Sequence, residues 1–133
     1  FIEDNIYFCK PYDNLEYEGV KISTIPAYNK HKEFHPKNKN WVGYLLEIKG
    51  TKYYIAGDTD ATKEASKVEC DVAFLPVGGT YTMDYIEAAD LARKISPEYV
   101  IPIHYGTIVG EPEDGEQFKS LIDGKDIKCE IYI

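Results

Sequence analysis

Residues 71–106 read DVAFLPVGGTYTMDYIEAADLARKISPEYVIPIHYG and contain two apolar runs that flank a helical pattern. The runs at 71–76 and 99–103 are short and continuous, which is typical of strands buried on both faces. Between them, apolar residues recur at the spacing of one helix face: Ala88, Leu91, Ala92 and Ile95. Thr82 or Asp84 is a suitable N-cap for this helix. The segment therefore predicts a βαβ unit.

The flanking segments extend this unit into one α/β domain. Residues 19–25 read as a strand, and residues 41–48 and 53–56 read as a β-hairpin with Gly50 in its turn. A weaker helix is expected at 116–122, and residues 127–133 alternate as a closing strand. The sequence thus predicts a hairpin-rich first half, then βαβ, then a closing strand, within a single domain of residues 1–133.

Composition narrows the class of protein. The net charge of -8 argues against nucleic-acid partners and against a polybasic membrane-binding surface. No apolar run approaches the roughly 18 residues of a membrane span. Three cysteines, odd in number and far apart, suit a reducing compartment better than a disulfide framework. We therefore expect a cytoplasmic globular protein.

Polar groups follow three of the apolar runs. Asp58 comes after YYIAG, the tripeptide Gly78-Gly79-Thr80 comes after AFLPV, and His104 comes after VIPI. The carboxyl ends of strands in open α/β sheets commonly form ligand sites, and a carboxylate with an imidazole suits zinc or a similar divalent metal. Within GDTD, Thr59 could orient the Asp58 carboxylate and Asp60 could cap the following turn. The alternative is an ordinary turn after each strand.

A polar loop, NKHKEFHPKNKN at residues 29–40, carries two histidines and four lysines in an otherwise acidic chain. One interpretation places this loop over the strand ends, where His35 or a lysine meets an anionic substrate group. The other is a solvated loop, which we favour for the lysines. His31 has a lysine on each side and is expected to be exposed.

The ordered motifs YYIAGDTD, DVAFLPVGGTYTMDYIEAADLA and VIPIHYG resemble the C-terminal half of a metallo-β-lactamase-fold hydrolase. The nearest branch groups cytoplasmic metal-dependent hydrolases with lactone-cleaving enzymes of ascorbate metabolism. This resemblance implies the C-terminal portion of an αββα sandwich. It also implies that Asp58 and His104 are metal ligands and that Gly78, Gly79 and Thr80 shape the substrate loop.

The chain departs from the family pattern in two places. The family's HxHxDH motif is absent and the chain begins at Phe1, so we expect a fragment that lacks the N-terminal half of the fold. Many relatives place a metal-binding histidine where this chain has Asn29. His35 or His31 could take that role, or the site could manage without it.

The resemblance implies a zinc-type hydrolase in which two metal ions activate water against a small lactone, amide or phosphoester. Two ligands do not make a tight site, so we expect this chain to be inactive alone. A mononuclear site of His31, His35, Asp58 and His104 is a further option. The alternative from another class is a non-catalytic binding or dimerisation module, since a truncated fold exposes apolar surface that favours a homo-oligomer.

Overall fold

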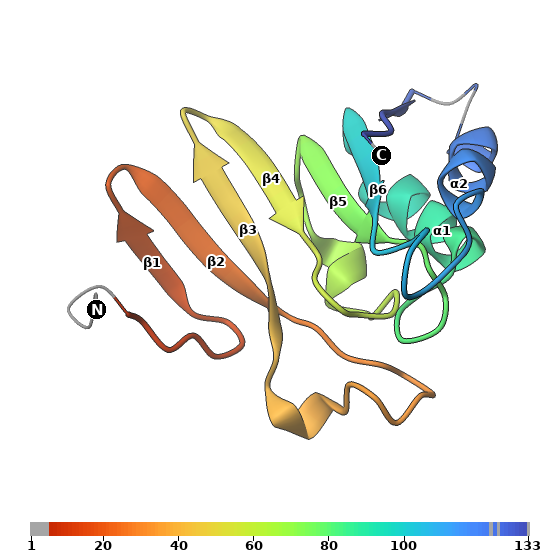
Figure 1. Cartoon of the computed structure of the whole chain (residues 1–133). Helices are drawn as coiled ribbons and strands as arrows, with labels where there is room; N and C mark the ends of the chain where they lie inside the picture. The colour runs from red at the N-terminus through yellow and green to blue at the C-terminus, as the bar shows by residue number, and fades with distance from the viewer. Residues whose placement is uncertain (1–5, 123, 125, 133) are drawn as a thin grey trace.

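The computed structural model describes residues 6–122, 124 and 126–132, and in them one sheet of seven strands runs across the molecule (Figure 1). The spatial order of the strands is their order along the chain. The strands are β1 (Asn14–Tyr17), β2 (Val20–Pro26), β3 (Val42–Ile48), β4 (Thr51–Ile55), β5 (Val72–Pro76), β6 (Tyr99–Ile103) and β7 (Lys128–Cys129). Neighbours are antiparallel from β1 to β4 and parallel from β4 to β7.

The helices belong to the parallel part of the sheet. They are α1 (Tyr85–Ile95) and α2 (Asp114–Ile122), with short 3-10 turns η2 (Lys37–Lys39) and η3 (Ala65–Lys67). Helix α1 begins after Asp84, whose side chain accepts a hydrogen bond from the Glu87 N–H at 2.8 Å. Asp84 is therefore the N-cap, because its carboxylate binds an N–H of the first turn that has no partner within the helix.

Most of the predicted elements are confirmed. The βαβ unit is β5–α1–β6, and the hairpin is β3–β4. Strand β1 was not expected, because four residues are too few for their alternation to stand out from a turn, and three of the four are exposed. The closing strand is shorter than predicted, with residues 128 and 129 paired to β6; its predicted last residue, 133, lies outside the described residues.

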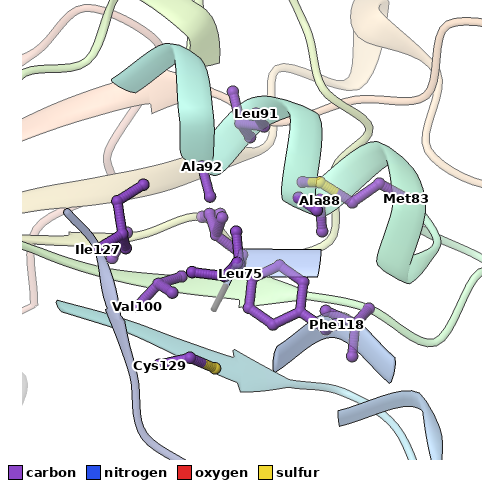
Figure 2. Close-up of a cluster of buried hydrophobic side chains, with 14 of the residues drawn as sticks. Leu75, Met83, Ala88, Leu91, Ala92, Val100, Phe118, Ile127 and Cys129 are labelled. Carbon is purple, nitrogen blue, oxygen red and sulfur yellow. The ribbon is translucent and has the colours of Figure 1, made fainter. Parts of the chain in front are cut away.

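The hydrophobic core lies between the sheet and the two helices. Leu75 of β5 and Val100 of β6 are fully buried, and they meet Leu91 of α1 and Phe118 of α2 in one cluster (Figure 2). Every second residue of β5 and β6 points into this cluster, since side chains alternate along a strand. No helix in the described part of the chain is long and apolar enough to cross a membrane.

The other face of the sheet is apolar and only partly covered. Val72, Phe74, Tyr99 and Ile101 alternate with the core residues and stay half-buried. The expectation that these strands are buried on both faces is therefore wrong for the described residues. A continuous apolar run shows that both faces of a strand carry apolar side chains. It does not show that both faces are covered, and in the described residues helices cover only one face of the sheet.

Two glycines allow the strand ends to approach one another. A Cβ at Gly43 would lie 2.4 Å from the carbonyl oxygen of Ala56, and one at Gly78 would lie 2.3 Å from that of His104. Either contact is far inside van der Waals distance, so a side chain at either position would push neighbouring backbone apart. The close packing of β3, β4, β5 and β6 where Asp58 and His104 emerge depends on these positions.

Candidate metal centre

Asp58 lies at the centre of a group of three side chains from distant parts of the sequence. Its Oδ1 is 3.5 Å from Nε2 of His104, and its Oδ2 is 3.3 Å from Nε2 of His35. The Asp58 side chain is 47% exposed, whereas His104 is 32% and His35 is 14% exposed. The carboxylate thus faces one imidazole with each oxygen and remains open to solvent.

His104 is presented by the end of β6 in an unusual backbone conformation. Its φ is +59°, in the left-handed region that residues other than glycine rarely adopt. The Nδ1 atom is buried and has no hydrogen-bond partner among the described residues. Strained backbone at a strand end is common at ligand sites, where the surrounding structure holds a side chain in a required direction.

His35 reaches Asp58 because the loop before β3 closes on itself. The Asn29 N–H donates to the His35 carbonyl at 2.8 Å, and the His35 N–H donates to Oδ1 of Asn29 at 2.9 Å. Nδ1 of His35 lies 3.2 Å from the same Asn29 oxygen and 3.1 Å from the Tyr81 carbonyl. The loop therefore holds the His35 ring by its backbone and by one ring nitrogen.

Three of the loop lysines form ion pairs that fasten the loop to the rest of the protein. Lys30 pairs with Glu87 at 2.9 Å, Lys32 with Asp60 at 3.5 Å and Lys37 with Glu64 at 2.7 Å. Lys32 also donates to the Thr82 carbonyl. The contacts of these lysines are therefore with the protein, a role that neither sequence interpretation included.

Glu64 sits in the most strongly bonded of these contacts. It accepts from Lys37 Nζ at 2.7 Å and from the Tyr28 hydroxyl at 2.7 Å. Burial by itself raises the pKa of Glu64, but these hydrogen bonds outweigh it and lower the pKa to about 2. Desolvation and the bond to Glu64 raise the pKa of Tyr28.

Thr59 was expected to orient Asp58 and Asp60 to cap the following turn, but both side chains bond elsewhere. The Thr59 hydroxyl accepts from the Tyr28 N–H at 3.1 Å and donates to the Tyr28 carbonyl at 3.2 Å. Asp60 is 3% exposed, and its Oδ2 accepts from the Lys30 N–H at 2.8 Å. Both residues bind the loop that carries His35, because the strand end lies directly beneath it.

A hollow of about 280 Å³ opens beside the carboxylate. It is lined by Ala27, His35, Trp41, Val42 and Asp58. The indole of Trp41 meets the His35 ring edge-on, with 5.2 Å between ring centroids. Nothing in the sequence pointed to Trp41 as a site residue, because an isolated tryptophan before a strand is ordinarily a packing residue. Larger hollows lie elsewhere on the sheet, but this one contains the candidate ligands.

The remaining predicted site residues lie around this group. His31 is exposed, and the Asn29 amide is buried in contacts with protein. Gly78 packs against the His104 backbone, and the Thr80 N–H bonds the Gly78 carbonyl at 2.9 Å.

The donors fit a divalent metal in chemistry but not in number. Imidazole nitrogen and carboxylate oxygen are both normal zinc ligands. However, the described residues contain no group of three or more histidine, cysteine, aspartate or glutamate side chains arranged to hold a metal ion. Asp58 lies between the histidines, as a bridging carboxylate would, so each histidine faces a different oxygen.

Comparison with known proteins gives the context for this geometry. Residues 1–104 match the model of the beta-lactamase superfamily domain. The UPF0173 metal-dependent hydrolase of Thermococcus onnurineus (strain NA1) is 36% identical over 119 residues, which are 86% of this chain and 53% of that protein. The chain therefore spans about half the length of the curated relatives it matches.

Solved structures agree. A protein of Parabacteroides distasonis ATCC 8503, described as a metal-dependent hydrolase, superposes with a TM-score of 0.82 at 35% identity, covering 92% of this chain and 56% of that one. A Thermotoga maritima protein, described as a Zn-dependent hydrolase of the metallo-β-lactamase superfamily, gives 0.72 at 25% identity, covering 93% and 70%. The predicted metallo-β-lactamase-type α/β fold is confirmed.

Proposed function

The chain belongs to the β-lactamase superfamily, and we propose that it carries one side of the divalent-metal site of a hydrolase. In this proposal Asp58, His104 and His35 would be metal ligands; His104 faces one oxygen of Asp58 and His35 faces the other. The remaining ligands come from outside the described residues, since the relatives are about twice as long as this chain.

One observation carries the proposal. The Asp58 carboxylate lies 3.3 and 3.5 Å from two Nε2 atoms that belong to residues 23 positions before it and 46 positions after it, at the carboxyl edge of the sheet. A half-exposed carboxylate gains little stability from such pairs. Asp58, His35 and His104 would instead act as metal ligands, and the charge of a bound cation would favour their close approach.

When bound, zinc or a similar ion lowers the pKa of a coordinated water and polarises the bond that is hydrolysed. We propose two such ions in the complete protein. The chain's own residues do the rest: Asp58 and the two histidines hold the metal side, and Trp41 with Val42 forms the wall of the adjacent hollow. This wall excludes water from one side of the substrate.

The substrate in this proposal is a small lactone, amide or phosphoester. The hollow of about 280 Å³ lies just below the usual range of small-molecule pockets, about 300 to 1,000 Å³, so it suits a small substrate. A substrate with an anionic group would suit this site, because a bound metal cation would attract the negative charge. We propose the cytoplasm as the location of the protein, because three cysteines, odd in number and far apart in the sequence, suit a reducing compartment.

A zinc titration followed by calorimetry tests the site. Each histidine faces a different Asp58 oxygen, so this chain would offer any one ion two ligands, fewer than the three that zinc sites ordinarily have. The chain alone should therefore bind zinc no tighter than micromolar and should not turn over substrate. Asp58→Ala should abolish the binding, and Asp126→Ala, at an exposed position, should leave it unchanged. Submicromolar stoichiometric binding by the wild type contradicts the incomplete ligand set, and binding that survives Asp58→Ala contradicts the assignment of Asp58.

The alternative function is a non-catalytic binding or dimerisation module. The half-covered apolar sheet face that contains Phe74 and Ile101 favours it, because such a face gains free energy by association. The two functions differ in their dependence on Asp58, which lies at the edge of the sheet and not on that face.

A further inference from the structure

The side-chain amide of Asn29 has an orientation that its partners determine. Its Nδ2 lies 2.9 Å from Oδ1 of Asp60 and 2.9 Å from the Tyr81 carbonyl oxygen, and both of these atoms only accept hydrogen bonds. Its oxygen faces the His35 N–H at 2.9 Å, which only donates. The opposite orientation of the amide would break all three hydrogen bonds. Asn29 is only 6% exposed, so water could not replace them.

This orientation determines which nitrogen of His35 carries its proton. Nδ1 of His35 lies 3.2 Å from the Asn29 oxygen and 3.1 Å from the Tyr81 carbonyl oxygen. Two acceptors face this nitrogen, so it must be the donor. In a neutral ring, Nε2 is then left with a free lone pair, and this is the atom that points at Asp58.

Asp60 holds Asn29 in place from the strand end. Besides the Asn29 amide, it accepts from the Lys30 N–H at 2.8 Å and lies 3.5 Å from Lys32 Nζ. The Asp60 N–H in turn donates to the Tyr28 carbonyl at 3.0 Å. The loop on both sides of Asn29 is therefore bound to one buried residue, through the Asp60 N–H on the Tyr28 side and the Asp60 carboxylate on the Lys30 side.

We propose that Asn29 and Asp60 are positioning residues that present His35 to the metal site as its Nδ1–H tautomer, with Nε2 as the ligand atom. This inference rests on the proposed function for the identity of what Nε2 binds. The orientation of the His35 ring, however, is set by contacts within the protein and does not require a metal. A neutral His35 and the Asp58 carboxylate then face each other with lone pairs, an arrangement that a cation between them makes favourable.

The tautomer can be measured directly in the metal-free chain. Long-range ¹H–¹⁵N correlation spectra of histidine-labelled protein contain three histidines, which His31→Asn and His35→Asn variants assign. At about pH 9, well above the ordinary histidine pKa of about 6.5, His35 should carry its proton on Nδ1. A His35 with its proton on Nε2 overturns the proposal, and this outcome requires no variant of Asn29 to fold.

The effect of Asn29 and Asp60 on metal binding is measured separately, by cobalt titration. Cobalt(II) should quench Trp41, the only tryptophan of the chain, because its ring lies 5.2 Å from that of His35. Asn29→Ala should weaken cobalt binding 10- to 100-fold and populate both His35 tautomers, the usual size of effect for a residue that orients a ligand. Asp60→Asn should act in the same direction, because one of its two acceptors becomes a donor that faces another donor.

Asn38→Ala is the matched control, since Asn38 is an exposed asparagine of the same loop. It should change neither the tautomer nor the affinity. If Asn29→Ala and Asp60→Asn also change neither, the positioning role is wrong. Failure of the proposed function looks different: the wild type would show the Nδ1–H tautomer and no cobalt quenching. Quenching together with the Nε2–H tautomer would overturn only the positioning role.

Discussion

Two aspartates two positions apart illustrate how burial assigns roles at the residue scale. Asp58 has a side chain that is 47% exposed and faces two imidazoles, whereas Asp60 is 3% exposed and accepts from the Asn29 amide and the Lys30 N–H. A buried carboxylate is stable only when it is well hydrogen-bonded, so Asp60 organises the chain around it. Asp58 keeps an open side on which a ligand can bind.

Glu64 gives a prediction about acid stability. Its pKa of about 2 in the folded protein lies below the ordinary value of 4.5, so its bonds to Lys37 and Tyr28 stabilise the fold above about pH 4.5. That contribution is lost as the pH falls from 4.5 toward 2, because the unfolded chain takes up the proton first. Urea unfolding from pH 6 to pH 2.5 should show a smaller loss of stability for Glu64→Gln than for the wild type.

Glu113→Gln, at an exposed position, is the control for this experiment. It should lose stability with acid as steeply as the wild type. An equal slope for Glu64→Gln and the wild type would show that the cluster of Lys37, Tyr28 and Glu64 contributes nothing to acid stability.

At the scale of elements, helix α1 links the core to the candidate site. Its buried face packs on the sheet, while Glu87 in its first turn accepts from the Ala61 N–H at 3.2 Å and pairs with Lys30 of the loop. The start of the helix is therefore tied to both segments that flank Asp58 and His35. A change at the helix N-terminus should therefore alter the position of the loop.

Asp84→Ala removes the N-cap of this helix. We expect the free energy of unfolding to fall by about 1 kcal/mol, because the Glu87 N–H loses its acceptor. Urea denaturation measures this loss. Asp84→Asn keeps an acceptor at the same place and should lose no more than a few tenths of a kcal/mol. Equal losses for the two variants would mean that the charge of Asp84, and not its cap, stabilises the helix.

At the scale of the whole molecule, the sheet has a covered face and an open one. Helices α1 and α2 pack beside β5 and β6 (Figure 1), and the alternate apolar side chains of these strands remain half-buried. The relatives are about twice as long as this chain. Their additional residues can cover such a face. For the 133-residue chain alone, a second copy can do so.

Self-association through this face is therefore expected. Sedimentation velocity at increasing protein concentration should show species larger than the monomer, and Phe74→Glu should return the chain to a monomer, because the substitution places a charge in the middle of the open face. Ile86→Glu is the control, at an exposed apolar position of α1. A wild type that stays monomeric at all concentrations, or a Phe74→Glu variant that associates as before, would contradict the prediction.

The amino-acid sequence by itself determined the order and type of the main elements. Hydrophobic periodicity and caps are local, so β5, α1 and β6 could be read from the residues that form them. The sequence also placed Asp58 and His104 at strand ends, because each follows an apolar run directly. The sequence shows that His35 belongs to a polar loop, but it could not show that the His35 side chain lies beside Asp58. It also could not show that Thr59 and Asp60 bind that loop.

Only the tertiary structure brought His35 to Asp58. The contacts that do so join Asn29 to Asp60, 31 positions apart, and to the Tyr81 carbonyl, 52 positions apart. Such hydrogen bonds leave no periodic trace, since any loop rich in asparagine and lysine has the same composition whether it is solvated or fastened down. The chain encodes its strands through local patterns, but it builds the site through pairings that exist only once the strands are side by side.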